Sequence, residues 1–108
     1  MTLSEELSVN NIPDRLFALT ECVSYFNYKY FDKTNKITIK HLKEYMQKFG
    51  ILKSNFKPYI KYTKSDIGLE LVVVKNNSFF HTIKDSDLFL TKVGLETMIK
   101  LLKNGKYI

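Results

Sequence analysis

The chain offers few side chains that could act as nucleophiles or as soft metal ligands. It contains two histidines, His41 and His81, and one cysteine, Cys22. Zinc sites need cysteine or histidine ligands at short, regular spacings, and none of these three residues has such a partner. The sequence also lacks a glycine-rich phosphate loop and a Gly-x-Ser-x-Gly elbow. We therefore expect no metal site, no cofactor, and two histidines that are structural or face solvent.

One set of acidic and basic residues superficially matches the site of metal-dependent nucleases, namely Asp66, Glu70 and Lys75. That chemistry needs the glutamate and the lysine on the same face of one strand, so that both reach the metal-bound water. Here the two are five residues apart, and alternation along a strand places an odd-spaced pair on opposite faces. Asp85 and Asp87 are two residues apart and could share one face of a strand. The surrounding residues are typical of a turn, however, so loop and cap roles are favoured for them. These observations indicate a protein that is not an enzyme and takes no small-molecule substrate.

The positive charge is concentrated in one third of the chain. The protein carries 17 lysine and arginine residues against 11 aspartate and glutamate residues, a net charge of +6. Residues 33–64 hold nine lysines and one acidic residue, whereas residues 1–32 hold two basic and five acidic residues. Clustered positive charge favours an anionic partner, most often nucleic acid, although lysines also solubilise polar surfaces without any partner.

The length and composition indicate one folded domain, residues 1–108, with residues 1–11 as a polar lead of weak helix or disorder. A chain of 108 residues with 44% hydrophobic residues is too short for two cores and too apolar for disorder throughout. Its apolar runs of about four residues exclude a membrane span, which needs about 20. The N-terminus lacks the features of a secretory signal, and a single cysteine favours a reducing compartment. We expect an intracellular protein, in the cytoplasm or in a host nucleus.

The spacing of apolar residues predicts helices in the first part of the chain. The first begins at Pro13 and carries an apolar stripe to Tyr30, and it is a candidate contact for a homodimer. The second runs over residues 39–49 and ends at Gly50, because glycine adopts the left-handed backbone of a helix end at little cost. A third helix begins at Ser54, which is a suitable N-cap.

After these helices, the spacing of the apolar residues changes from a helical period to one typical of strands. Strands over residues 69–75 and 79–83, joined by an asparagine-rich turn at 76–78, predict a hairpin. A short third strand is predicted over residues 88–90. A last helix follows it; Thr91 caps this helix, Gly94 weakens it and Gly105 ends it.

This order of elements predicts a small α+β domain with a helix-turn-helix-like pair of helices and a β-hairpin wing. In such a domain the helix that begins at Ser54 lies in the major groove of duplex DNA, and the hairpin tip reaches the backbone or the minor groove. Lysines supply most of the affinity through phosphates, and the amide of Asn55 can pair with an adenine edge. The predicted DNA contacts are Lys40, Lys43, Lys53, Asn55, Lys57, Lys61, Lys64, Lys75, Asn76 and Asn77.

Four short stretches carry a family resemblance: residues 37–45, 49–51 and 56–61, and the phrase that begins at Phe89 and continues to Met98. Through them, residues 37–103 resemble the N-terminal DNA-binding domains of phage antirepressors and of their relatives in large DNA viruses. The resemblance implies a compact DNA-binding module in a viral or prophage regulator.

A second hypothesis belongs to another class. The chain would be a small viral or bacterial protein that binds and inhibits a host protein through exposed aromatic side chains, which are favoured at the centres of interfaces. The candidate residues are Tyr25, Tyr28, Tyr59 and Tyr62. One coherent basic face favours DNA, whereas lysines scattered round an aromatic patch favour a protein partner.

Overall fold

The computed structural model describes residues 12–31, 34–63, 70–75 and 84–108. These residues form an α+β domain, as the sequence predicts. In chain order the elements are strand β1 (Phe17–Ala18), helix α2 (Leu19–Lys29), helix α3 (Ile39–Lys48), the 3-10 turn η1 (Ile60–Tyr62), strand β2 (Val72–Val74), the 3-10 turn η2 (Asp85–Asp87), strand β3 (Leu88–Leu90) and helix α4 (Lys92–Asn104).

The strands form one antiparallel sheet in the order β1-β3-β2, with β3 in the centre. Leu90 of β3 lies opposite Phe17 of β1 on one side and Val72 of β2 on the other. All three side chains are completely buried, so this row of the sheet faces the core. The predicted strand 88–90 is therefore confirmed as the partner of β2, whereas the predicted strand 79–83 and turn 76–78 lie outside the described residues.

The start of the first helix differs from the prediction. Helix α2 begins at Leu19 and not at Pro13, because Phe17 and Ala18 are extended and pair with β3. Glu21 stabilises this start, since its carboxylate accepts a 3.0 Å hydrogen bond from the Ala18 N–H group and lies 3.1 Å from the guanidinium of Arg15. Burial of Phe17 in the sheet thus takes precedence over an earlier helix start.

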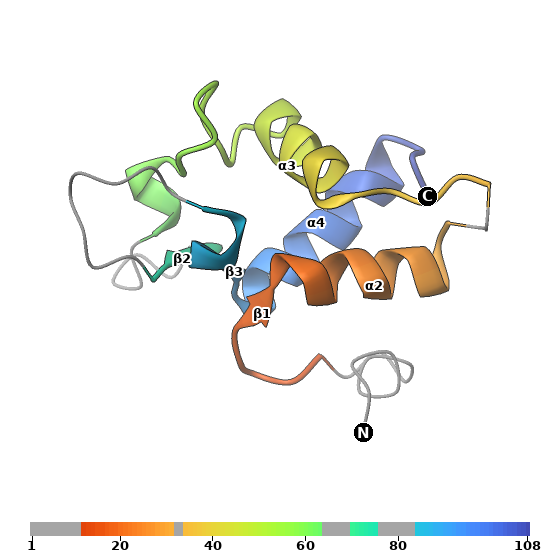
Figure 1. Cartoon of the computed structure of the whole chain (residues 1–108), viewed down its shortest axis with the longest axis horizontal. Coiled ribbons are helices and arrows are strands. Elements are labelled where there is room, and N and C mark those ends of the chain that lie inside the picture. Colours follow the sequence, from red (N-terminus) through yellow and green to blue (C-terminus); the bar gives the residue numbers. More distant parts are fainter. Residues whose placement is uncertain (1–11, 32–33, 64–69, 76–83) are drawn as a thin grey trace.

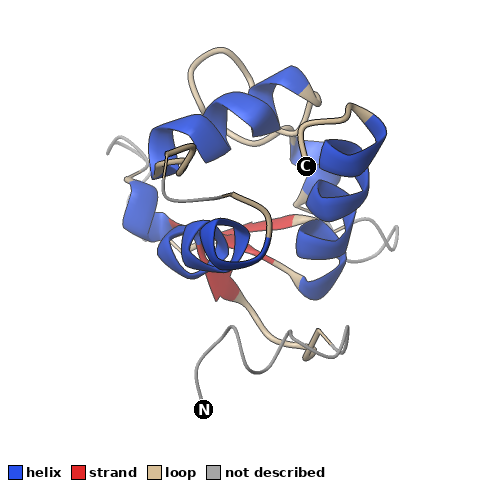
Figure 2. Cartoon of the chain, turned by 90° about the vertical axis from the view of Figure 1, so that its right-hand side faces the viewer, coloured by secondary structure: helices blue, strands red, loops and turns tan. Residues whose placement is uncertain are grey.

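The three helices of the described chain surround the short sheet. Helices α2 and α4 both contact β3, and α2 also packs on α3. Figure 1 shows α3 above α2, and Figure 2 shows the sheet enclosed among the helices. The fully buried core side chains come from every one of these elements; the largest are Phe17, Phe26, Leu19, Leu42, Met46, Ile51, Leu52, Leu88, Leu90, Leu95 and Met98.

The last helix agrees with the prediction at both ends. Thr91 is its N-cap, with its hydroxyl accepting a 2.9 Å hydrogen bond from the Gly94 N–H group, and Gly105 is its C-cap. Gly94 has a role that the sequence did not reveal. A Cβ atom there would lie 2.0 Å from the carbonyl oxygen of Leu71, so glycine lets α4 approach the residue that precedes β2.

The second predicted helix is confirmed, but the third is wrong. Helix α3 covers residues 39–48, and Gly50 after it has the expected left-handed backbone, with φ of 78°. Residues 54–59 instead form a turn and an isolated antiparallel bridge, and the 3-10 turn η1 follows them. Pro58 explains much of this, because proline donates no helical hydrogen bond and disfavours helical backbone at the residue before it.

Candidate functional site

The segment predicted as a recognition helix forms a tight loop, which we call the basic hairpin (residues 52–58). Leu52 and Pro58 are opposed at its base. The Lys53 N–H group donates a 2.8 Å hydrogen bond to the Lys57 carbonyl, and the Phe56 N–H group donates a 2.9 Å bond to the Lys53 carbonyl. The hairpin projects from the body of the molecule directly after α3 (Figure 1). Its chain reversal replaces the predicted helix.

Hydrogen bonds to the framework hold the base of the hairpin. The side-chain amide of Gln47 on α3 donates to the Lys53 carbonyl at 2.9 Å. The Tyr59 N–H group donates to the Ile51 carbonyl at 3.1 Å. Leu52 and Ile51 are each 2% exposed and anchor the base in the core. The loop is therefore held in one conformation on a rigid support.

Lys43 of α3 contacts both the hairpin and η2. Its ammonium group lies 2.7 Å from a carboxylate oxygen of Asp85 in η2 and 4.6 Å from the ring centre of Phe56. Phe56 itself has a positive φ of 63°, a backbone conformation that a bulky residue adopts only where its surroundings impose it. Lys43 was predicted to contact DNA, but its side chain is 18% exposed and already paired.

Three exposed lysines remain on and beside the hairpin, Lys53, Lys57 and Lys61. Within the described part of the chain, no acidic side chain forms an ion pair with them. Tyr59 lies among them and is 40% exposed. The ammonium groups of Lys53 and Lys61 lie 5.6 Å and 6.0 Å from its ring centre. We call Lys53, Tyr59 and Lys61 the Tyr59 cluster.

The structure brings together only part of the predicted contact set. Asn55 lies in the turn of the hairpin, and its side-chain oxygen accepts a 3.0 Å hydrogen bond from the Lys57 N–H group. Pairing with adenine would therefore require this oxygen to accept a second hydrogen bond. Lys40 is exposed in the first turn of α3, about 12 Å of helix before the end of α3 that leads to the hairpin. Lys75 is exposed after β2, with its ammonium group 5.3 Å from the ring centre of Phe89.

The remaining predicted contacts lie outside the described residues. They are Lys64, Asn76 and Asn77. The local signals for the hairpin were nevertheless present in the sequence. An asparagine whose side chain can accept a main-chain hydrogen bond and a proline three residues later both compete with a helix.

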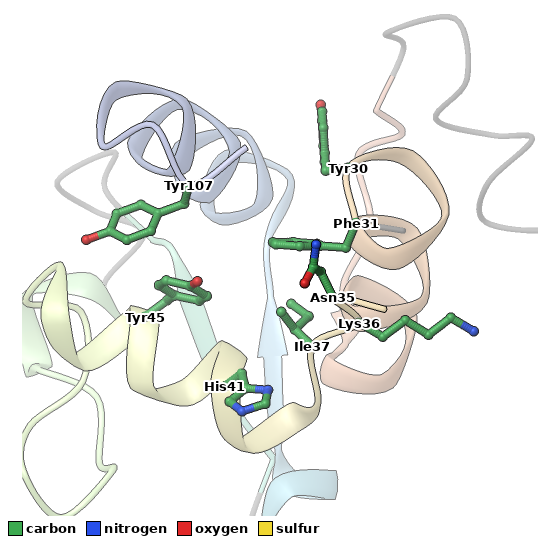
Figure 3. A pocket seen from close by; sticks show the side chains of 8 residues that line it. All are labelled: Tyr30, Phe31, Asn35, Lys36, Ile37, His41, Tyr45 and Tyr107. Atoms are coloured by element: carbon green, nitrogen blue, oxygen red, sulfur yellow. The ribbon is translucent and has the colours of Figure 1, made fainter. Parts of the chain in front are cut away.

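A second feature, which the sequence did not predict, is an open hollow of about 510 Å³ between α2, α3 and the C-terminal residues. Tyr45 and Tyr107 line one side, while Tyr30 and Phe31 line the other (Figure 3). The rings of Tyr45 and Tyr107 are 5.1 Å apart and edge-on, so they mainly join the chain end to α3. Burial raises the pKa of Tyr30, with the neighbouring Tyr25 as a smaller cause.

The described histidine and cysteine have structural roles. His41 caps α3, because its Nδ1 atom accepts a 3.0 Å hydrogen bond from the Thr38 N–H group. Burial is the main cause that raises the pKa of the Cys22 thiol to about 12, and the nearby Glu21 adds to it. The part of the chain that the structure describes contains no group of three His, Cys, Asp or Glu side chains that could hold a metal ion. His81 lies outside it.

Two further observations bear on the sequence-based hypotheses. The aromatic surface proposed for a host protein loses Tyr25, which is 2% exposed. Tyr28, which is 71% exposed, and Tyr59 come from different elements, and Tyr62 is half-buried.

No helix among the described residues is long and apolar enough to cross a membrane.

Comparisons of the chain with known protein families, with curated proteins and with solved structures find no match in any of the three. The resemblance to phage antirepressors therefore stays a prediction from short motifs.

Proposed function

We propose that the protein binds DNA through phosphate contacts made by the basic hairpin. One observation carries the proposal: Lys53, Lys57 and Lys61 are exposed within nine residues. Lys53 and Lys57 lie on a loop whose main chain is held by hydrogen bonds, and Lys61 follows in η1. Ordering a loop before it binds removes part of the entropic cost of association. A regulatory role in a phage or virus is the role that the family resemblance implies.

The mode of binding differs from that of a recognition helix. A projecting hairpin with lysine side chains can lie along a phosphate backbone, as a wing does in winged helix proteins. Lysine offers a compact charge and no planar fork for guanine, so contacts of this kind position the protein without reading the sequence. The proposal is therefore a DNA-binding protein of low sequence specificity.

Fluorescence anisotropy with a labelled AT-rich duplex tests the proposal. If Lys53, Lys57 and Lys61 neutralise one phosphate each, log affinity falls with log salt at a slope of about −2.7, or roughly 40-fold between about 50 and 200 mM salt. The double substitution Lys57→Glu and Lys61→Glu is expected to remove about two units of this slope and to weaken binding at least about tenfold.

A matched control separates local contacts from net charge. Lys100 and Lys106 are exposed near the C-terminal end of α4, and their change to glutamate alters the net charge by the same amount. This control is expected to weaken binding less than about threefold, because exposed charges beyond a Debye length are largely screened. No binding at low salt to either the duplex or its separated strands would contradict DNA binding, and equal losses in both double variants would contradict the hairpin as the contact surface.

A further inference from the structure

We infer that Tyr59 is a stacking platform for an unpaired base, so that the preferred partner is a single DNA strand. This inference rests on the proposed function, because the lysines beside Tyr59 are those that would hold the phosphates. It adds what the phosphate contacts alone leave open, namely which form of DNA the hairpin selects.

The position of Tyr59 is fixed while its ring is left open. Its N–H group donates to Ile51, and its carbonyl accepts a 3.0 Å hydrogen bond from the Tyr62 N–H group. The main chain is thus held on both sides of the residue, and the ring has only two side-chain torsions to order. Yet the residue as a whole is 40% exposed. A rigidly mounted, exposed aromatic ring loses little entropy when another ring stacks on it.

The two ammonium groups of the Tyr59 cluster complete the arrangement. Each lies within 6.0 Å of the ring centre. A nucleotide stacked on the ring carries a phosphate on each side of its sugar, and Lys53 and Lys61 can reach these phosphates. Cation–π contacts at exposed sites are worth only about 0.5–1 kcal/mol, so the lysines can move from the ring to phosphates. Single-strand binding proteins combine positive charge and aromatic rings in the same way.

Duplex DNA cannot use the ring in this manner. Its bases are already stacked on one another, and exposing one face of a base costs a few kcal/mol of stacking. Stacking of a base on an aromatic side chain is worth about 1–3 kcal/mol, which does not exceed that cost. The ring therefore adds affinity for a single strand and little or none for a duplex.

The neighbouring rings are less suited to this role. Phe56 is half-buried, and Lys43, which lies over its ring, is held there by its ion pair with Asp85. Tyr62 is also half-buried, and the ammonium group of Lys61 lies 4.9 Å from its ring centre. The geometry thus singles out Tyr59 beside the hairpin.

The test compares a labelled single strand, the same strand with abasic sites, and the duplex, each measured by anisotropy at one salt concentration. Tyr59→Ala is expected to weaken single-strand binding by about tenfold or more, which corresponds to the loss of one stacked base. Tyr59→Phe keeps the ring and is expected to bind within about twofold of the natural protein. Tyr59→Leu keeps the apolar volume without the ring and is expected to behave as Tyr59→Ala does.

Two matched controls complete the design. Tyr28→Ala removes a tyrosine that is more exposed but lies on α2, and it is expected to leave binding unchanged. The abasic strand offers phosphates without bases, so Tyr59→Ala is expected to bind it as the natural protein does. Thermal unfolding of every variant verifies that the fold is intact.

The outcomes separate the two proposals. If Tyr59→Ala leaves single-strand binding unchanged while the double substitution at Lys57 and Lys61 abolishes binding to all strands, the stacking role is overturned and DNA binding stands. If the natural protein binds neither strand nor duplex at low salt, both proposals fail.

Discussion

The helical framework and the basic hairpin are held together in different ways. In the framework the buried side chains are apolar, and no polar or charged side chain in the described residues is buried. In the hairpin Lys53, Asn55 and Lys57 are exposed, and hydrogen bonds of the main chain and of two amide side chains hold the loop. Packed interiors resist small changes of volume, whereas exposed positions tolerate substitution. Substitutions in the hairpin are therefore expected to alter the proposed DNA contacts without a change in fold.

The largest loss of stability is expected from Gly94→Ala, a substitution in the helical framework. The new Cβ atom would lie 2.0 Å from the Leu71 carbonyl oxygen, so the main chain of α4 or of the segment before β2 must shift. Overpacking against main chain that cannot move aside is expected to cost about 3 kcal/mol of unfolding free energy or more, measured by urea denaturation. Gly50→Ala is the matched change beside the hairpin. It meets no atom within 4 Å and is expected to cost about 1 kcal/mol, from its positive φ alone. Equal losses would contradict the contrast between the two regions.

A second framework effect depends on pH. In the unfolded chain the Cys22 thiol ionises near its ordinary pKa of 9.0, whereas burial raises its pKa to about 12 in the folded protein. The stability that the neutral thiol contributes is complete below pH 9 and is lost as the pH rises toward 12, because only the unfolded thiol can ionise there. Relative to Cys22→Ala, the natural protein is expected to lose about 2 kcal/mol by about pH 11, measured by denaturation across the pH range. Parallel pH profiles would contradict the burial of an ionisable thiol.

The smallest losses of stability are expected from substitutions of two asparagines, one in each region, whose side chains both accept a hydrogen bond from the main chain. Asn27 on α2 accepts a 2.8 Å hydrogen bond from the Ile37 N–H group and donates a 3.0 Å bond to the Ile37 carbonyl. Ile37 is 7% exposed, so Asn27→Ala leaves its main-chain groups unpaired and is expected to cost about 2 kcal/mol. Asn55→Ala removes one exposed hydrogen bond in the hairpin and is expected to cost less than about 0.5 kcal/mol. Thermal or urea unfolding of both variants provides the comparison, and a larger loss at Asn55 would reverse it.

The local signals in the sequence predicted some elements well. Helix α3 with Gly50 after it, and helix α4 between Thr91 and Gly105, were predicted closely. The apolar stripe, the cap and the glycine of each helix all lie within or next to that helix. The local sequence is therefore enough to predict where each of these helices begins and ends. The strand at 88–90 was also predicted, from its composition and its position between turns.

In two other segments, contacts with the rest of the fold override the helix that the local sequence pattern predicts. Residues 17–18 lie within the segment predicted as the first helix, but their partner β3 lies about seventy residues further along the chain. Residues 54–63 also have helical spacing, yet their main-chain hydrogen bonds close a hairpin instead. In both places a local pattern permits two structures, and contacts with the rest of the fold select one.

The basic character of the protein, the concentration of positive charge in residues 33–64 and the α+β class all follow from the amino-acid sequence. Which of these lysines have a partner and which face solvent follows from the folded structure. Lys43 and Lys57 belong to the same lysine-rich segment, but Asp85, 42 residues away in the chain, pairs with Lys43, while Lys57 faces solvent on the hairpin. The physical reason is that composition fixes the number of charges, whereas their partners come from parts of the chain that only folding brings together.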